Sequence, residues 1–468
     1  MMQALITIFY MISAVLFIRG IKLLGKAETA SKGNLISAVG MLVAVLTVLV
    51  EKDVLKASLE GYIWIVAAVA VGSVIGYIWS KKAEMTGMPQ LVALFNGFGG
   101  LSSFLVAISQ YLTTPADAVE PFAASTLAIT IAIGAITFTG SVVAWGKLDG
   151  KFFKKNLKLP AKNMINAVLC IAGLIGVVMY TISKGNASLG LAGVVLVALT
   201  YLVLGFTMVW PIGGGDMPVI ISLLNACSGL AAAFAGLAIG NSVLVVSGCL
   251  VGTSGLILTI IMCKAMNRTL FSLLFSSFGG GASSKKAAGE AKEPKAMSVE
   301  DAYLVLEAAR NVAIIPGYGM AVAQAQHAVK DLCDRLEDNG CEVNFAIHSV
   351  AGRMPGHMNV LLAEANIEYE KLKTGEDMNT QMPNVDVAIV IGANDVVNPS
   401  ALDDETSPLY GMPIINAFEA RMVFVLKRGR GTGFSGIENP LFTNDNTVMI
   451  YGDAKQTISA LVSEFDNV

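Results

Sequence analysis

Long apolar stretches recur along the first 270 residues of the chain and then stop. A helix that spans a membrane needs about 20 mostly apolar residues. Nine stretches reach or approach that length, and none carries Lys, Arg, Asp, Glu or His in its interior. The pattern predicts a polytopic α-helical membrane domain whose nine spanning helices are Ala4–Ile18, Asn34–Val50, Tyr62–Trp79, Leu91–Leu112, Phe122–Trp145, Met164–Ile182, Leu189–Val209, Val219–Ile239 and Ser242–Met262.

The last part of the chain has a different hydrophobic pattern. Short runs rich in β-branched residues alternate there with segments of helical periodicity. Continuous apolar strands separated by helices are typical of a parallel sheet that is covered on both faces. We therefore predict a doubly wound, Rossmann-like α/β domain with strands at Val312–Ile315, Glu342–Ile347, Val385–Ile391, Met422–Lys427 and Thr447–Tyr451, and with helices that include Met320–Asp338 and His357–Asn366.

Composition and charge support this division. The segment Phe278–Ser298 is rich in Gly, Ala, Ser and Lys and lacks an apolar period, which is typical of a flexible linker. We expect a transmembrane domain over residues 1–270, a linker over 271–299 and a nucleotide-binding domain over 300–468. Residues 1–270 carry 17 Lys/Arg and 9 Asp/Glu (+8), whereas residues 271–468 carry 15 and 26 (−11). Since phosphate backbones bind basic surfaces, nucleic acid is not an expected partner of the acidic domain.

The basic residues also predict an orientation. The loops after the odd-numbered helices hold 12 Lys/Arg and those after the even-numbered helices hold 3, which places the odd loops in the cytoplasm. With nine helices, the C-terminal domain then also lies in the cytoplasm. The first helix is followed, not preceded, by Arg19, Lys22 and Lys26, so we interpret it as a membrane anchor and not as a cleaved signal peptide.

Polar residues inside the predicted helices are candidates for a hydrated path. Hydroxylated residues often serve only helix–helix packing. An amide is costlier to leave unpaired in hydrocarbon, so Asn96 and Asn225 are better candidates. Asp216 precedes the helix that carries Asn225; a single acidic residue in a loop is usually just solvated, but this position favours a functional role.

The histidines and cysteines exclude some chemistry. His327, His348 and His357 all lie in the C-terminal domain, so a bis-histidine haem relay across the membrane is excluded. The six cysteines show no CxxC or metal-ligand spacing, and we predict no metal site.

A glycine-rich turn follows the first predicted strand, in the segment Pro316–Val322 (PGYGMAV), and a helix comes next. In this context a GxGxx(G/A) turn holds a pyrophosphate with backbone amides and a helix N-terminus. Val322 replaces the third glycine, and a purely structural turn remains the alternative. The context favours dinucleotide binding.

The strand ends indicate which dinucleotide is bound. An NAD site usually has a carboxylate at the end of the second strand, but here that strand ends in Ile347-His348-Ser349. Basic residues follow strand ends instead, at Arg353 and in the cluster Lys427-Arg428-Gly429-Arg430. Unless these loops are merely solvated, they favour a 2′-phosphate and thus NADP(H) over NAD(H). Two further strand ends, Gly392–Pro399 and Gly452-Asp453-Ala454, lie where open α/β sheets bind ligands.

Several motifs together resemble the β subunit of the proton-translocating NAD(P) transhydrogenases. In the C-terminal domain they are PGYGMAVAQAQ, VAGRMPGHMNVLLAEA, IGANDVVNPSA, KRGRGTGF, ENPLF and GDAK. In the membrane part they are MPQLVAL, TFTGSVVAWGKL, GGDMPV, LNACSG and IMCKAMNR. The resemblance covers nearly the whole chain in order.

The resemblance implies a multi-pass protein of the cell inner membrane with NADP(H) bound in a cytoplasmic domain. It implies an α subunit that binds NAD(H), a dimer of such heteromers in membrane lipid, and reduction of NADP⁺ by NADH driven by proton entry. The cofactor-binding residues expected from the strand ends and the resemblance are Gly317, Tyr318, Gly319, Met320, Ala321, Val322, Val350, Ala351, Gly352, Arg353, Met354, Gly392, Ala393, Asn394, Asp395, Val396, Val397, Asn398, Lys427, Arg428, Gly452, Asp453 and Ala454.

The same resemblance assigns coupling and channel roles. His348 and Asp395 resemble the residues that link nucleotide binding to proton movement, and Ser141 and Asn225 resemble channel positions; we add Asn96 and Asp216 from their places in the sequence. Two positions depart from the family, since Asn96 stands where relatives often have His and Phe434 where a lid Tyr is frequent. Rival interpretations are a transporter or channel regulated by a nucleotide-binding Rossmann domain, and a membrane NADPH oxidoreductase that uses flavin or haem.

Overall fold

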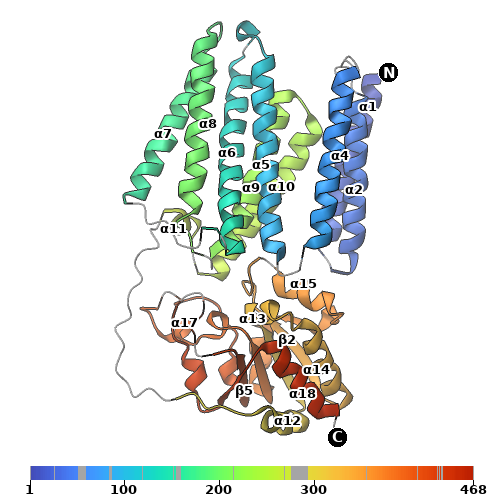
Figure 1. The fold of residues 1–468 in the computed structure, drawn as a ribbon, viewed down its shortest axis with the longest axis vertical. Helices are drawn as coiled ribbons and strands as arrows, with labels where there is room; N and C mark the ends of the chain where they lie inside the picture. Colours follow the sequence, from blue (N-terminus) through green and yellow to red (C-terminus); the bar gives the residue numbers. More distant parts are fainter. Residues whose placement is uncertain are drawn as a thin grey trace. The chain divides into compact units, whose positions relative to one another are not determined.

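The computed structural model describes residues 2–25, 27–50, 59–83, 87–118, 120–150, 152–153, 160–213, 216–267, 269–275, 293–354, 356–407, 409–429, 431, 433 and 436–466. The chain divides into two compact units, one made of Met1–Pro211 and Ile220–Leu258, the other of Ile212–Val219 and Thr259–Val468 (Figure 1). Most of the expected linker lies outside the described residues, so the domain limits stay a prediction.

Among the described residues, nine helices are long and apolar enough to cross a membrane, which confirms the predicted polytopic domain. Several extend beyond the apolar stretches because a helix continues past the hydrocarbon core, and long basic side chains such as Arg19 and Lys22 can extend toward the polar boundary. The nine helices are α1 (Met2–Leu24), α2 (Ala27–Leu49), α4 (Leu59–Lys82), α5 (Met88–Thr113), α6 (Pro121–Asp149), α7 (Lys162–Thr181), α8 (Ala187–Val209), α9 (Met217–Ile239) and α10 (Ser242–Ala265).

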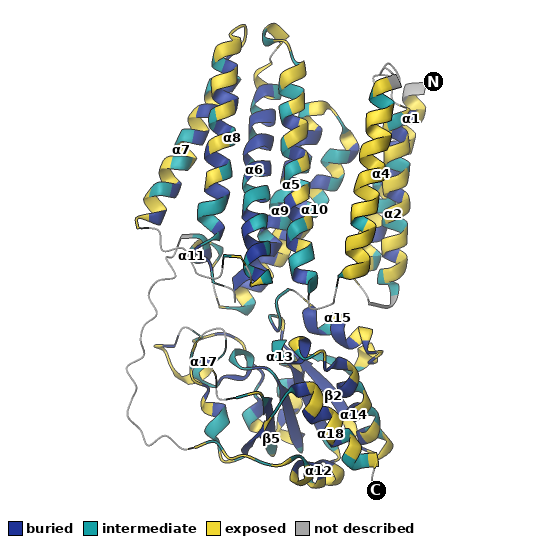
Figure 2. Ribbon diagram, in the orientation of Figure 1, coloured by how far each residue is buried: buried dark blue, intermediate teal, exposed yellow. Residues whose placement is uncertain are grey.

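Helix α6 is the most enclosed helix of the membrane unit. Two-thirds (67%) of its apolar window is buried, whereas α4 has 0% buried, and Figure 2 shows the same contrast between the two helices. Small residues let α5 approach α6 closely: a Cβ on Gly100 would lie 2.7 Å from the Thr137 Cβ, and a Cβ on Gly134 would lie 2.7 Å from the Gly100 oxygen. Close backbone approach through small residues is the usual way in which membrane helices pack.

The C-terminal sheet is parallel and has six described strands in the order β3-β2-β1-β4-β5-β6. This result confirms the Rossmann-like fold class. The sequence pattern missed β3 because that short strand is polar and pairs only at the edge of the sheet. The strands are β1 (Asn311–Pro316), β2 (Glu342–Ile347), β3 (Leu372–Thr374), β4 (Val387–Ile391), β5 (Met422–Lys427) and β6 (Thr447–Tyr451).

Both faces of this sheet are covered. The side chains of Ala313 and Ile315 belong to one buried cluster with Met382, while Val312 and Ile314, on the alternate positions of β1, are also fully buried. Helices α12 and α18 contact each other, as do α14 and α18. The helices of this unit beyond α10 are α11 (Leu270–Phe275), α12 (Val299–Ala308), α13 (Tyr318–Val322), α14 (Gln326–Asp338), α15 (His357–Glu364), α16 (Gly375–Gln381), α17 (Ser400–Asp403) and α18 (Ala454–Asp466).

One predicted helix is wrong in its continuity. The segment predicted as a single helix over Met320–Asp338 is divided into α13 and α14. Gln324 has a φ of 48°, in the left-handed region, and the Ala325 N–H donates to the Met320 oxygen, which closes α13 after little more than one turn. The short α13 leaves the glycine turn as a compact structure at the end of β1.

Candidate functional site

The carboxyl ends of β1 and β4 lie side by side and define the site. The chain passes from β1 to β2 on one side and returns to β4 on the other, so the strand order reverses here. Open α/β sheets bind ligands at such a reversal, beyond the carboxyl ends of the strands. Gly317 follows β1 and Gly392 follows β4, so both predicted loops begin at this point.

These two loops are in direct backbone contact. The Gly319 N–H donates to the Gly392 oxygen at 2.9 Å, and the Gly317 N–H donates to the Ile391 oxygen at 2.9 Å. A Cβ on Gly317 would lie 2.5 Å from the Ala393 Cα, and one on Gly319 would lie 2.6 Å from the Gly392 Cα. No side chain fits at either position, so steric contact with the neighbouring backbone explains why both residues are glycine.

The departure at Val322 has a simple structural account. In helix α13, Met320 and Ala321 are buried, while the Val322 side chain is 42% exposed. Because the Val322 side chain reaches solvent, this position has room for it. The missing third glycine therefore does not disrupt the turn.

His348 lies just beyond β2 and is 5% exposed. The Val350 N–H donates to its Nδ1 at 3.2 Å, so the hydrogen of the neutral ring is on Nε2, which lies 2.6 Å from the Pro413 oxygen. Burial lowers the pKa of His348, and the hydrogen bond to Pro413 opposes that shift. The ring is therefore neutral at pH 7 and connects the end of β2 to the loop before Ala417.

Arg353 and His357 occupy the next part of the same loop. The guanidinium carbon of Arg353 lies 4.3 Å from the centre of the Tyr318 ring, which places a cation beside the glycine turn. The His357 ring centre lies 6.4 Å from that of Tyr318. The segments that follow β1 and β2 thus contact each other through the Arg353 guanidinium and the rings of Tyr318 and His357.

The loop after β4 is held by asparagines. Asn398 is fully buried and its Nδ2 donates to the Glu438 oxygen at 3.3 Å, while Asn439 Nδ2 donates to the Asn394 oxygen at 2.9 Å. The Asn394 Nδ2 donates to Asp395 Oδ1 at 3.3 Å. Within the described parts of the chain, the buried Asn394 Oδ1 has no hydrogen-bond partner. Sequence reasoning gave no role to Glu438 or Asn439, although both belong to the ENPLF motif.

Lys427 ends β5 beside these loops. Its Nζ lies 4.6 Å from the centre of the Phe442 ring and donates to the Gly431 oxygen. Burial lowers the pKa of Lys427, and the nearby Asp395 carboxylate opposes this shift. Arg428 is exposed, and the predicted lid residue Phe434 lies outside the described residues. Sequence reasoning gave no role to Phe442, although it is the last residue of the ENPLF motif.

The loop after β6 has a structural explanation. Asp453 Oδ1 accepts the Lys455 N–H at 3.1 Å and the Gln456 N–H at 3.5 Å, at the start of α18, and the Gly452 N–H donates to the Lys427 oxygen at 3.1 Å. The carboxylate therefore serves as a helix cap. The proximity of Gly452, Asp453 and Ala454 to a ligand stays a prediction.

Three predicted membrane residues come from helices that contact one another. Asn96 of α5 donates from Nδ2 to the Ile221 oxygen of α9 at 3.2 Å, one turn before the half-buried Asn225. A Cβ on Gly97 would lie 3.0 Å from the Cβ of Ser141 in α6. The Ser141 Oγ is buried and has no hydrogen-bond partner in the described part of the chain. The structure thus brings α5, α6 and α9 together around polar side chains.

Asp216 belongs to the other compact unit. It immediately precedes α9 and is 6% exposed, so the solvated-loop interpretation does not hold for it. Groups of three or more His, Cys, Asp or Glu able to hold a metal are absent from the residues that the structure describes.

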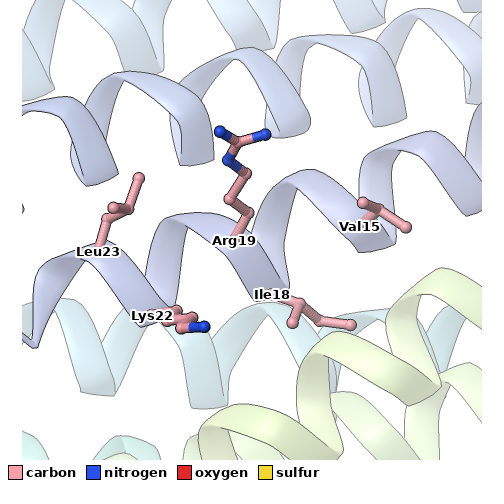
Figure 3. A pocket seen from close by; sticks show the side chains of 5 residues that line it. All are labelled: Val15, Ile18, Arg19, Lys22 and Leu23. Carbon is pink, nitrogen blue, oxygen red and sulfur yellow. The ribbon is translucent and has the colours of Figure 1, made fainter.

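A hollow of about 480 Å³ lies elsewhere, on the surface of α1. Figure 3 shows the side chains that line it, all from one helix. It offers no backbone amides and no second wall, and its lining is mostly apolar. The residues that line the hollow are Val15, Ile18, Arg19, Lys22 and Leu23. A dinucleotide needs convergent polar groups, so this hollow does not compete with the site at the strand ends.

Fold and site together define a polytopic membrane protein with a Rossmann-like domain whose strand ends form a glycine-rich ligand cradle. The family model described as NAD(P) transhydrogenase beta subunit matches residues 6–464, so the chain belongs to that family. Two sequences from Rhodospirillum rubrum, each named NAD(P) transhydrogenase subunit beta, are 44% identical to it over 461 residues, which is 97% of this chain and 97% of each relative.

Proposed function

We propose that this chain is the NADP(H)-binding and proton-channel subunit of an NAD(P) transhydrogenase. It would couple hydride transfer between NADH and NADP⁺ to proton translocation across the membrane. The observation that carries the proposal is Lys427, a partly buried cation at the end of β5, beside the glycine contact of the β1 and β4 loops. Such a cation recognises the phosphate by which NADP(H) differs from NAD(H).

The residues present fit that cofactor. The turn Gly317–Val322 would cradle the pyrophosphate, the loops Val350–Met354 and Gly392–Asn398 would line the cofactor, and Lys427 with Arg428 would bind the 2′-phosphate. The unpartnered Asn394 Oδ1 supplies an acceptor in this cradle. When bound, the nicotinamide supplies the hydride chemistry, and the chain contributes orientation, charge and exclusion of water.

The family description "beta subunit" implies a partner α subunit, which would bring the NAD(H) domain. We propose a dimer of such heteromers in the inner membrane, with the C-terminal domain in the cytoplasm. The excess of Lys/Arg in the loops after the odd-numbered helices supports this orientation.

The proton path would run between α5, α6 and α9. Asn96 uses one amide hydrogen on Ile221, which leaves its other polar atoms for water, and the Ser141 hydroxyl has no partner among the residues that the structure describes. Together with Asn225 they offer acceptors and donors for a hydrated wire in place of an imidazole. Asp216, His348 and Asp395 would transmit protonation to the nucleotide site. Coupling requires that protonation change the relative affinity for NADP⁺ and NADPH.

The test is reconstitution of the full chain with its α subunit in liposomes, with hydride transfer and internal pH recorded together. We expect NADPH-dependent reduction of an NAD analogue, a matched pH change, and no flavin or haem absorbance. A regulated transporter would move ions without this reaction. If Asp395→Asn leaves NADPH release and its pH dependence unchanged, the coupling role of Asp395 is excluded.

A further inference from the structure

His357 is the most completely enclosed titratable side chain near the glycine turn. It is 1% exposed, its Nδ1 accepts the Arg353 N–H at 3.2 Å, and its Nε2 has no hydrogen-bond partner among the residues that the structure describes. A buried polar atom without a partner costs free energy. Among the described residues, the hydrogen bond of this ring is the one that Nδ1 accepts.

The protonation state follows from this hydrogen bond. A backbone N–H can only donate, so Nδ1 carries no hydrogen and the neutral ring has its hydrogen on Nε2. Burial, and secondarily the positive charge of Arg353, lower the pKa of His357 to about 4. At physiological pH the ring is thus a permanent acceptor for Arg353.

The loop is built around the ring. Gly352 has a φ of 100°, and a Cβ there would lie 2.4 Å from the His357 Nδ1. The His357 N–H donates to the Met354 oxygen at 3.2 Å, and Gly356 has a φ of 68°. The backbone therefore bends closely around the imidazole, and the Arg353 Cα is fixed on one side of it.

This arrangement sets where the Arg353 side chain begins. The guanidinium reaches the face of Tyr318, 4.3 Å from the ring centre, and Tyr318 lies inside the glycine turn between Gly317 and Gly319. A cation held there lies beside the turn that would cradle a pyrophosphate.

We propose that His357 is a positioning residue: through its Nδ1 it holds the Arg353 backbone so that the guanidinium lies over Tyr318 and binds the pyrophosphate of a dinucleotide. This inference rests on the proposed NADP(H) function and adds to it a residue that does not touch the cofactor. The geometry assigns the role to one atom, and that atom can be kept or removed by substitution.

The chain permits a matched pair of variants. In His357→Asn the amide oxygen takes the place of Nδ1 and can still accept the Arg353 N–H. In His357→Gln the longer side chain places its amide near Nε2 and leaves the Arg353 N–H without its acceptor. His327→Gln is the control, because His327 is exposed on α14.

The experiment measures binding of NADPH and of adenosine 2′-monophosphate to the full-length chain in detergent or nanodiscs. Adenosine 2′-monophosphate contains the 2′-phosphate but no pyrophosphate. We expect His357→Gln to weaken NADPH binding about threefold to tenfold, as expected for one lost buried hydrogen bond. Its affinity for adenosine 2′-monophosphate should match that of the unmodified protein, and His357→Asn should restore NADPH binding.

Arg353→Gln tests whether His357 acts through the arginine. If it does, His357→Gln in the Arg353→Gln background weakens NADPH binding no further. The inference is overturned if His357→Gln binds NADPH normally, if it weakens both ligands equally, if His357→Asn is as defective as His357→Gln, or if the two losses are additive. Absence of NADPH binding by the unmodified chain would instead overturn the proposed function.

Discussion

The membrane helices and the C-terminal sheet satisfy their buried polar groups in opposite ways. In the membrane unit most hydroxyls bond to their own helix: Thr130 Oγ1 donates to the Thr126 oxygen at 2.8 Å and Thr137 Oγ1 to the Ile133 oxygen at 2.7 Å. In the sheet domain, side chains reach distant segments, as His348 does with Pro413. A helix in lipid must satisfy its own polar groups, so side-chain bonds that cross between membrane helices, as those of Asn96 and Asn166 do, are more informative there than in the sheet domain.

The reverse criterion applies in the C-terminal domain. Long-range side-chain bonds are ordinary there, and the informative groups are buried atoms without a partner among the described residues: the Asn394 Oδ1, the His357 Nε2 and the Gln326 Oε1. Asn394 lies in the loop after β4, His357 begins α15 and Gln326 begins α14. The two regions therefore need different criteria for recognising functional residues.

The largest expected effect is at the strand crossing. Gly317→Val should reduce NADPH binding by more than about 100-fold, because even a Cβ would lie 2.5 Å from the Ala393 Cα and the backbone must move. Equilibrium binding to the full chain measures it. Gly76→Val in α4 is the control, since a Cβ there meets nothing within 4 Å. Normal binding by Gly317→Val would show that the close approach is not needed.

The next effect concerns Lys427. Lys427→Gln should weaken NADPH binding about 10-fold to 100-fold and leave NADH binding unchanged, because a charge-assisted bond to the 2′-phosphate is lost. The comparison of the two dissociation constants measures it. Equal weakening for both nucleotides would contradict a 2′-phosphate role.

The pH dependence of NADPH binding has a definite sign. Burial lowers the pKa of Lys427, so its positive charge is present below that pKa and is lost as the pH rises through it. NADPH affinity should therefore fall on the alkaline side, beginning at lower pH than for an exposed lysine. Lys427→Arg should remove this decline, since arginine stays charged; a pH titration of affinity measures both.

Within the membrane, Asn96 and Asn166 form a matched pair. Each is 8% exposed and bonds to a neighbouring helix, Asn96 to Ile221 and Asn166 to the Thr207 hydroxyl at 2.7 Å. We expect Asn96→Leu to reduce the rate of proton translocation in liposomes about 10-fold without changing NADPH binding. An increase of about 1.4 kcal/mol in the activation free energy of proton transfer is enough for a 10-fold lower rate. Asn166→Leu should leave translocation near normal. Equal losses would mean that Asn96 serves packing alone.

The smallest expected effect is on acid stability. The folded-state pKa of His357, about 4, is lower than the ordinary value near 6.5, so the unfolded chain binds more protons between these limits. Stability should therefore decrease as the pH falls from 7.5 to 5.5, by about 1 kcal/mol from this residue.

Cys333 and Cys341 are buried, so a thiol reagent labels them when the C-terminal domain opens. The rate of labelling at each site, followed by mass spectrometry, measures the stability of this domain. His357→Asn should lose the contribution of His357 to the pH dependence. If the pH dependence of stability is unchanged in His357→Asn, the assignment of this dependence to the low pKa of His357 is contradicted.

Much of the fold followed from local patterns. Apolar length predicted the nine membrane helices, and β-branched runs predicted five of the strands. The patterns failed at β3, whose pairing at the sheet edge leaves little apolar signal, and at Gln324, whose left-handed φ interrupts a segment of continuous helical periodicity.

The sequence by itself determined the two-part architecture, the glycine turn and the basic strand ends, because each depends on residues close together in the chain. Only the tertiary structure decided which of these meet: Gly319 against Gly392, Arg353 over Tyr318, and Asn96 against Ile221. Such contacts join segments that are tens of residues apart or more. Their geometry arises from strand order and helix packing, which no single stretch of sequence encodes.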